Sequence, residues 1–146
     1  MKYIKISIIL AVIFSLFGCD TTNTPCNQRK NLPNNMVYAY DQKTEERTAT
    51  ITVTRDEGTL GYFCKIGLYI NTQLAGRFST KETKQFYVKP GKVLLKAIRD
   101  PYGKGICNWK CKDTNSQQEI FIKRGENKFY RIRTASCGIY IQQTNR

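Results

Sequence analysis

The clearest pattern in this chain is an alternation of polar and apolar residues over positions 47–55. Ala49, Ile51 and Val53 fall on one side of an extended backbone, and threonines fall on the other side. A period of two with many threonines is typical of a strand that has one buried face. Similar short strand signals follow at positions 62–71, 74–78, 86–89, 93–98, 119–123, 128–133 and 137–142.

Turn residues separate these segments. Asp56-Glu57-Gly58, Pro90-Gly91 and the stretch 124–127 are three of these turns, and along the whole series the strands and turns alternate at a spacing of roughly ten residues, which is typical of an all-β domain. No segment among them has a sustained apolar stripe at the helical period. We therefore predict an all-β fold over residues 47–146, a small antiparallel sandwich or barrel of seven or eight strands.

The stretch before these strands is polar. Residues 20–35 are rich in Thr, Asn, Gln and Pro and have almost no apolar side chains. Such a composition is typical of a flexible linker, so we expect residues 19–46 to include a polar tether that precedes the folded domain. Residues 36–40 are more apolar, and we interpret them either as a first short strand or as an extension docked on the domain.

The first eighteen residues have the layout of an export signal. Lys2 and Lys5 precede a run that is apolar from Ile6 to Phe17 apart from two serines. This run is too short for a membrane span, which needs about 20 apolar residues. An ordinary signal peptide or an uncleaved anchor is the alternative interpretation, but Phe17 disturbs the small-x-small pattern of an ordinary cleavage site.

The segment Leu16-Phe17-Gly18-Cys19 resembles the lipobox of bacterial lipoproteins. The resemblance implies that residues 1–18 are cleaved off and that Cys19 becomes an acylated first residue, because several acyl chains together anchor a protein stably. It also implies a lipid-anchored location in the bacterial cell envelope, on the periplasmic side. Asp20 resembles a signal for retention in the inner membrane, and the outer membrane stays open as an alternative. The tether would hold the domain a few tens of ångströms from the bilayer.

The amino-acid composition limits the reactions and the binding partners that this chain can have. The net charge of +13 falls by two when Lys2 and Lys5 leave with the signal. The chain has no histidine, so the usual general base, triad member and metal ligand is missing. A basic surface favours anionic surroundings such as phospholipid headgroups, lipopolysaccharide phosphates or cell-wall carboxylates. Export argues against nucleic acid, and a solvated surface with no specific partner is the alternative.

The chain has six cysteines, of which five remain when Cys19 is set aside. Export places them in an oxidising compartment, where two disulfides and one spare thiol are the simplest arrangement. Cys26 is the expected spare because it lies in the polar N-terminal stretch. Cys107 and Cys111 are separated by three residues, so they do not form a redox CxxC motif. Without histidine or a second close cysteine pair they are a poor match to a zinc site.

Two segments resemble the PEGA-type β-domains of lipoproteins. Residues 86–95 resemble the strand, Pro-Gly turn and strand of that family, and residues 125–132 resemble the entry to its penultimate strand. The hairpin at 70–75 departs from the family pattern because no glycine occupies its turn. The resemblance covers about residues 48–142 and implies an immunoglobulin-like β-sandwich with no catalytic activity.

The same resemblance implies a disulfide pairing. Related exported proteins have a cysteine before the hairpin strand and another in a Gly-Lys-Gly-x-Cys loop, and Cys64 and Cys107 occupy these places. The resemblance thus implies a bond between Cys64 and Cys107 and leaves Cys111 and Cys137 as the second pair. Four cysteines allow three pairings, and their spacing alone does not choose among them.

No arrangement of residues indicates catalysis. Ser79 and Lys81 lack the Ser-x-x-Lys spacing, and the acid pairs at 45–46 and 56–57 are adjacent in polar stretches, where such acids are usually solvated. Gly103-Lys104-Gly105 is too short for a phosphate-binding loop. We expect no catalytic residues, no metal site and no cofactor.

Two groups of residues are candidates for binding. An aromatic and basic loop can stack on sugar rings or hold anionic groups, and its members are Tyr102, Lys104, Trp109, Lys110 and Lys112. A basic patch can attract anions, and its members are Lys128, Arg131 and Arg133. The alternatives are a turn-rich loop with Trp109 in the core, and a solvated sheet face that keeps the strand soluble.

Together these patterns predict a non-enzymatic, membrane-anchored lipoprotein that acts as a binding or scaffolding module. Its partners would be the membrane, through the acyl chains on Cys19, and an envelope protein or an anionic envelope component, with no nucleic acid. An exclusion or accessory lipoprotein of an envelope secretion or conjugation machine is the second hypothesis. An enzyme that acts on the cell wall is the third, and the missing histidine argues against it.

Overall fold

The computed structural model describes residues 22–58, 62–108, 116–135 and 138–145. The strands in these ranges are β1 Lys30–Asn31, β2 Ala49–Arg55, β3 Ile66–Ile70, β4 Gln73–Phe78, β5 Glu82–Val88, β6 Gly91–Arg99, β7 Ser116–Ile122, β8 Asn127–Ala135 and β9 Gly138–Thr144. Short 3₁₀ helices are η2 Cys26–Gln28, η3 Asn34–Met36 and η4 Gly105–Asn108.

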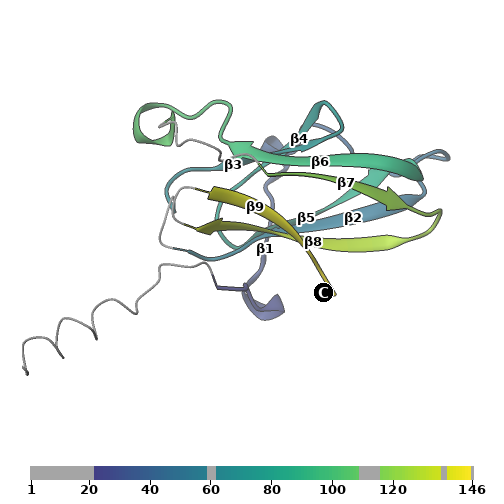
Figure 1. Cartoon of the computed structure of the whole chain (residues 1–146), viewed down its shortest axis with the longest axis horizontal. Helices are drawn as coiled ribbons and strands as arrows, with labels where there is room; N and C mark the ends of the chain where they lie inside the picture. Colours follow the sequence, from purple (N-terminus) through teal and green to yellow (C-terminus); the bar gives the residue numbers. More distant parts are fainter. Residues whose placement is uncertain (1–21, 59–61, 109–115, 136–137, 146) are drawn as a thin grey trace, which may run out of the picture.

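The strands form two sheets that pack face to face as a sandwich (Figure 1). One sheet has the order β1-β5-β2-β8-β9, and the other has the order β4-β3-β6-β7. This confirms the predicted all-β sandwich, with nine strands among the described residues in place of seven or eight. Most neighbours are antiparallel, but β1 runs parallel to β5, and β2 runs parallel to β8.

Strand β2 shows how the sequence pattern becomes structure. Ala49, Ile51 and Val53 are fully buried, while Thr50 and Thr52 between them are half-buried on the opposite face. The strand lies between β5 and β8, so both of its edges are hydrogen-bonded. Because β2 is central and has one apolar face, its pairing aligns the apolar residues of β5 and β8 on the same side of the sheet, toward the core.

The core lies between the two sheets. Phe86 from β5 and Phe78 from β4 meet across it, with ring centroids 6.2 Å apart and an interplanar angle of 62°. Both rings are fully buried. Aromatic pairs in this edge-to-face arrangement add to the stabilisation from buried apolar area. The core therefore joins the two sheets along the side where β4 and β5 lie.

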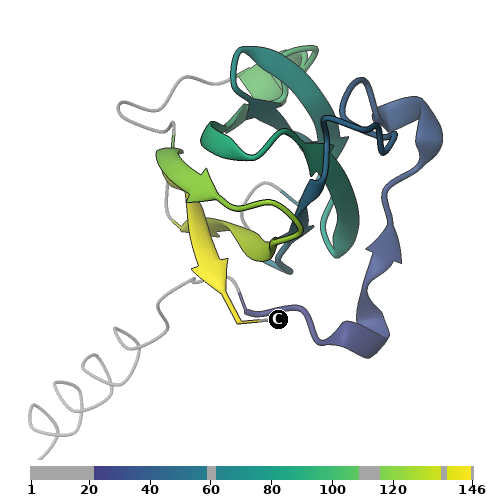
Figure 2. The ribbon, with the colours of Figure 1, turned by 90° about the vertical axis from the view of Figure 1, so that its right-hand side faces the viewer.

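The N-terminal stretch differs from the tether expected there. Residues 22–40 run along the side of the sandwich (Figure 2). Leu32 is 3% exposed and belongs to the core, and a Cβ atom on Gly76 would lie 2.8 Å from Leu32 Cδ2. Val37 forms a bridge to Gly76, so residues 36–40 are the docked extension. One buried leucine and a few hydrogen bonds to the edge of a sheet are enough to order a polar segment.

Candidate functional site

A disulfide joins two loops at one end of the sandwich. Cys64, just before β3, is bonded to Cys107 in η4, and the sulfur atoms are 2.08 Å apart. This confirms the pairing that the family resemblance implied. Cys111 and Cys137, the second expected pair, lie outside the described residues. Cys26, the expected spare, is free and exposed.

Arg55, at the end of β2, holds the Cys64 loop to β4. Its side chain is buried, and Nη1 donates hydrogen bonds to the carbonyl oxygens of Cys64 at 2.6 Å and Phe78 at 2.7 Å. Burial lowers the pKa of Arg55 to about 10, and the charge of Glu82 opposes the shift. Arg55 therefore stays charged at neutral pH, and its charged donor fixes the loop against the sheet.

The bonded loops expose four large side chains, which we call the aromatic tip: Tyr62 at 53%, Phe63 at 84%, Tyr102 at 60% and Ile106 at 74%. The rings of Tyr62 and Phe63 pack edge to face, with centroids 5.3 Å apart. Single exposed apolar residues are normal on a protein surface, but several gathered on neighbouring loops indicate a surface that contacts something.

An ion pair holds Tyr102 in place. Arg77 in β4 donates to both carboxylate oxygens of Asp100, from Nε and from Nη2, each at 2.7 Å. Asp100 Oδ1 also accepts a hydrogen bond from the Tyr102 backbone at 3.1 Å, and the Arg77 guanidinium lies 4.9 Å from the centroid of the Tyr102 ring. Burial alone would raise the pKa of Asp100, but the hydrogen bonds from Arg77 and Tyr102 outweigh it and lower the pKa. The loop therefore starts from a rigid base.

The structure describes two of the five residues predicted to form an aromatic and basic loop. Tyr102 and Lys104 are both exposed. The other three lie outside the described residues: Trp109, Lys110 and Lys112. Tyr62, Phe63 and Ile106 were not predicted from the sequence. The available signal was that Phe63 and Ile106 each directly precede a cysteine of the disulfide.

The three residues of the predicted basic patch all lie on β8, but the strand divides them between its two faces. Lys128 is in phase with the buried residues Tyr130 and Ile132, and its Nζ donates to the carbonyl oxygen of Phe121 at 2.7 Å. Lys128 thus bridges to β7 in the opposite sheet. Residues separated by an odd number of positions point to opposite faces of a strand, so the structure does not bring Lys128 together with Arg131 and Arg133.

Asp56 compensates the charge of Arg131. The Asp56 side chain is fully buried, and its Oδ2 lies 2.5 Å from Arg131 Nη2. Burial raises the pKa of Asp56, and the nearby charge and hydrogen bond of Arg131 oppose this shift. Arg133 donates to Gln142 Oε1 at 3.3 Å on the neighbouring strand β9. Arg131 is therefore committed to an internal ion pair.

The raised pKa of Asp56 leads to a prediction about pH. Between its ordinary pKa of 3.8 and the raised folded value, the folded protein holds a proton that the unfolded chain has lost. The contribution of Asp56 to the free energy of unfolding therefore falls as the pH rises between these two values. We expect the free energy of unfolding of the wild type, relative to Asp56→Asn, to fall in urea titrations as the pH rises above the ordinary pKa of 3.8.

Glu46 provides the control for this measurement. It forms an exposed ion pair with Lys89, whose hydrogen bond lowers the pKa of Glu46. Below the ordinary pKa of 4.5, the same comparison with Glu46→Gln should give a slope of opposite sign, because the contribution of Glu46 to stability rises with pH there and is constant above it. Equal slopes for the two variants would contradict the assignment of Asp56.

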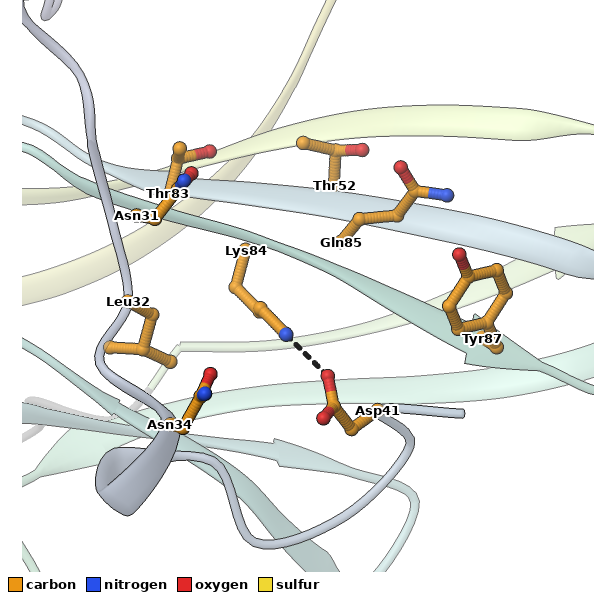
Figure 3. A pocket seen from close by; sticks show the side chains of 9 residues that line it. All are labelled: Asn31, Leu32, Asn34, Asp41, Thr52, Thr83, Lys84, Gln85 and Tyr87. Atoms are coloured by element: carbon orange, nitrogen blue, oxygen red, sulfur yellow. Dashed lines mark ion pairs between the residues drawn. The ribbon is translucent and has the colours of Figure 1, made fainter. Parts of the chain in front are cut away.

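A polar groove runs beside β5 (Figure 3). It has a volume of about 470 Å³ and lies between this strand and the N-terminal stretch, where Lys84 and Asp41 form an ion pair. The Leu32 amide donates to Thr83 O at 2.9 Å, and the Tyr87 amide donates to Tyr40 O at 2.8 Å, which closes the edge of β5 on both sides of the groove. The groove can hold a small polar molecule by hydrogen bonds. The groove was not predicted from the sequence, because one of its walls is formed by the stretch that was expected to be a flexible tether.

The described residues give little basis for metal or acid–base chemistry. Within these ranges, no group of three or more His, Cys, Asp or Glu side chains is placed to hold a metal ion. The buried acids Asp56 and Asp100 each face an arginine. A carboxylate that forms an ion pair with an arginine is a poor general acid or base. None of the helices in this part of the chain is long and apolar enough to cross a membrane.

Together, the fold and the site define a disulfide-bonded β-sandwich with an exposed aromatic tip. Comparisons of the chain with protein-family models, with curated proteins and with solved structures found no match. The likenesses to a lipobox and to PEGA-type domains therefore stay predictions from the sequence.

Proposed function

We propose that this chain is a non-enzymatic lipoprotein of the bacterial cell envelope, anchored on the periplasmic side through acyl chains on Cys19. It acts there as a binding or scaffolding module for an envelope protein or an anionic envelope component. The observation that carries the proposal is the segment Leu16-Phe17-Gly18-Cys19, directly after a short apolar run. An apolar run of this length with a positive start is an export signal and not a span.

The shape of the exposed surface supports a binding role. The aromatic tip offers apolar contact area on loops that are held by the Cys64–Cys107 disulfide and by the ion pair of Arg77 with Asp100. Binding residues commonly lie on loops that a rigid scaffold positions. A basic chain that is concentrated at a membrane by acyl chains meets anionic partners at high local concentration.

The anchor is tested by the variant Cys19→Ser, expressed as the full chain and followed by cell fractionation and by incorporation of labelled palmitate. We expect the wild type in the membrane fraction with label, and the variant without label and released from that fraction. The loss should be nearly complete, because each buried CH₂ contributes about 0.8 kcal/mol and a lipoprotein carries several chains.

The matched control is Cys26→Ser. Cys26 is exposed and lies seven positions further along the chain, so this variant should keep both the label and the membrane location. If Cys19→Ser still sediments with membranes and takes up palmitate, the anchor is not where we place it. Release of fragments from purified cell wall by the wild type would contradict the non-enzymatic role.

A further inference from the structure

The first described residues and the aromatic tip lie at the same end of the sandwich. Thr22 forms a bridge to Glu57, and its amide donates to the Glu57 carbonyl oxygen at 3.0 Å. The Glu57 amide in turn donates to Thr24 Oγ1 at 3.0 Å. Glu57 lies two positions after the end of β2, and Tyr62 and Phe63 come five and six positions after it in sequence. Figure 1 shows both regions toward the left of the view, with the green coil of η4 beside the upper sheet and the start of the coloured chain below the lower sheet.

The chain between the anchor and this end is short. Three residue steps separate Cys19 from Thr22, and a fully extended chain spans at most about 3.5 Å per residue, so the reach is about 10 Å. This placement rests on the proposed function, because it needs acyl chains on Cys19. A sulfur atom held at the bilayer would then keep this end of the sandwich next to the membrane, where the expected tether would have allowed tens of ångströms.

The chemistry of this end suits a phospholipid surface. Tyrosine combines an apolar ring with a polar tip and is enriched at the level of the headgroups, and phenylalanine adds apolar area that can be buried at the acyl boundary. Lys65 and Lys104 flank the two bonded cysteines in sequence, and anionic lipids attract such charges by about 1 kcal/mol each. The nearby acids are compensated within the protein, since Asp100 pairs with Arg77 and Glu57 pairs with Lys81.

We propose that the aromatic tip, formed by Tyr62, Phe63, Tyr102 and Ile106, inserts into the headgroup region of an anionic phospholipid bilayer and fixes the orientation of the anchored sandwich. The occupant of this surface is the membrane itself. The opposite end, where β8 begins and β9 ends, then points away from the bilayer and is presented to partners.

Depth-dependent fluorescence quenching tests this orientation. The acylated full chain is placed in vesicles of phosphatidylglycerol and phosphatidylcholine, with brominated or ordinary acyl chains. Trp109 is the only tryptophan, so Trp109→Phe gives a silent background for Phe63→Trp. We expect brominated lipid to remove about half of its emission, because interfacial side chains lie about 5–10 Å into the headgroup and acyl boundary.

Phe121→Trp in the same background is the matched control. Phe121 is also an exposed phenylalanine, at 64%, but it lies opposite Lys92 near the far end of the sandwich. We expect brominated lipid to leave its emission nearly unchanged. Equal quenching of the two variants, or none in either of them, overturns the orientation.

Sedimentation of the same samples separates this proposal from the one on which it rests. If the wild type does not pellet with vesicles, the anchor is wrong and the orientation falls with it. If the protein pellets and Phe63→Trp stays unquenched, the anchor stands and the aromatic tip is not a membrane surface. Pelleting together with quenching of Phe63→Trp alone supports both.

Discussion

Replacing Phe86 with alanine is expected to lower the free energy of unfolding by about 3–5 kcal/mol. Phe86 is fully buried, lies opposite Ile51 in its sheet and packs against Phe78 of the other sheet with centroids 6.2 Å apart. Truncation removes buried apolar area and leaves a cavity between two strands that cannot collapse freely. The aromatic contact across the two layers is lost as well, which adds to the transfer term.

Phe121→Ala is the matched control for this measurement. Phe121 sits on β7 with 64% of its surface exposed, so its truncation should change the free energy of unfolding by no more than about 0.5 kcal/mol. Urea titrations of the two variants at one pH, with equal slopes, give the comparison. Similar losses in both variants would mean that Phe86 is not in the core.

The second large effect concerns the bond between the two loops. The cysteines Cys64 and Cys107 are 43 positions apart, and closing a loop of this length removes enough entropy from the unfolded chain to contribute about 4 kcal/mol to stability. We expect the double variant Cys64→Ala with Cys107→Ala to lose most of this amount in chemical denaturation. The same variant should also show faster hydrogen exchange in β3 next to the missing bond.

Cys26→Ala serves as the control here, because Cys26 is free and exposed. Its unfolding midpoint should match that of the wild type. A double variant that is as stable as the wild type would show that the bond contributes no net stability, for example because the unfolded chain is already compact. Peptide mapping without reduction checks that the wild type carries the bond.

The sandwich could be predicted from the chain because its signals are local. The period of two in β2 places Ala49, Ile51 and Val53 in the core, and glycines mark where strands change over, Gly91 at the first position of β6 and Gly125 in the turn before β8. Both glycines have a positive φ, of 121° and 73°, which other residues rarely adopt. Such preferences act within a few residues, so no long-range contact is needed to recognise them.

The N-terminal stretch could not be predicted in this way. Its composition is polar, and it is ordered by contacts such as that of Leu32 with Gly76 and the pairing of β1 with β5. These are contacts between segments that are distant in sequence. The polar groove beside β5 depends on the same contacts, so it could not be predicted from the sequence either.

The candidate surface was predicted in part. The exposed loop with Tyr102 and Lys104 was recognised from its aromatic and basic residues, but Phe63 comes from another loop that the disulfide brings near. Lys128 was grouped with Arg131 although three positions separate them. The period of a strand already places such residues on opposite faces.

The parallel pairing of β2 with β8 has a consequence for how the protein is made. Thr50 lies opposite Asn127, so one edge of the central strand has no neighbour until most of the chain has been synthesised. Contacts of such long range make folding slow, on the order of milliseconds to seconds for all-β domains. An open edge during that time invites pairing with other chains. We therefore expect the growing chain to need shielding of this strand edge, for example by a holding chaperone, until β8 has been made.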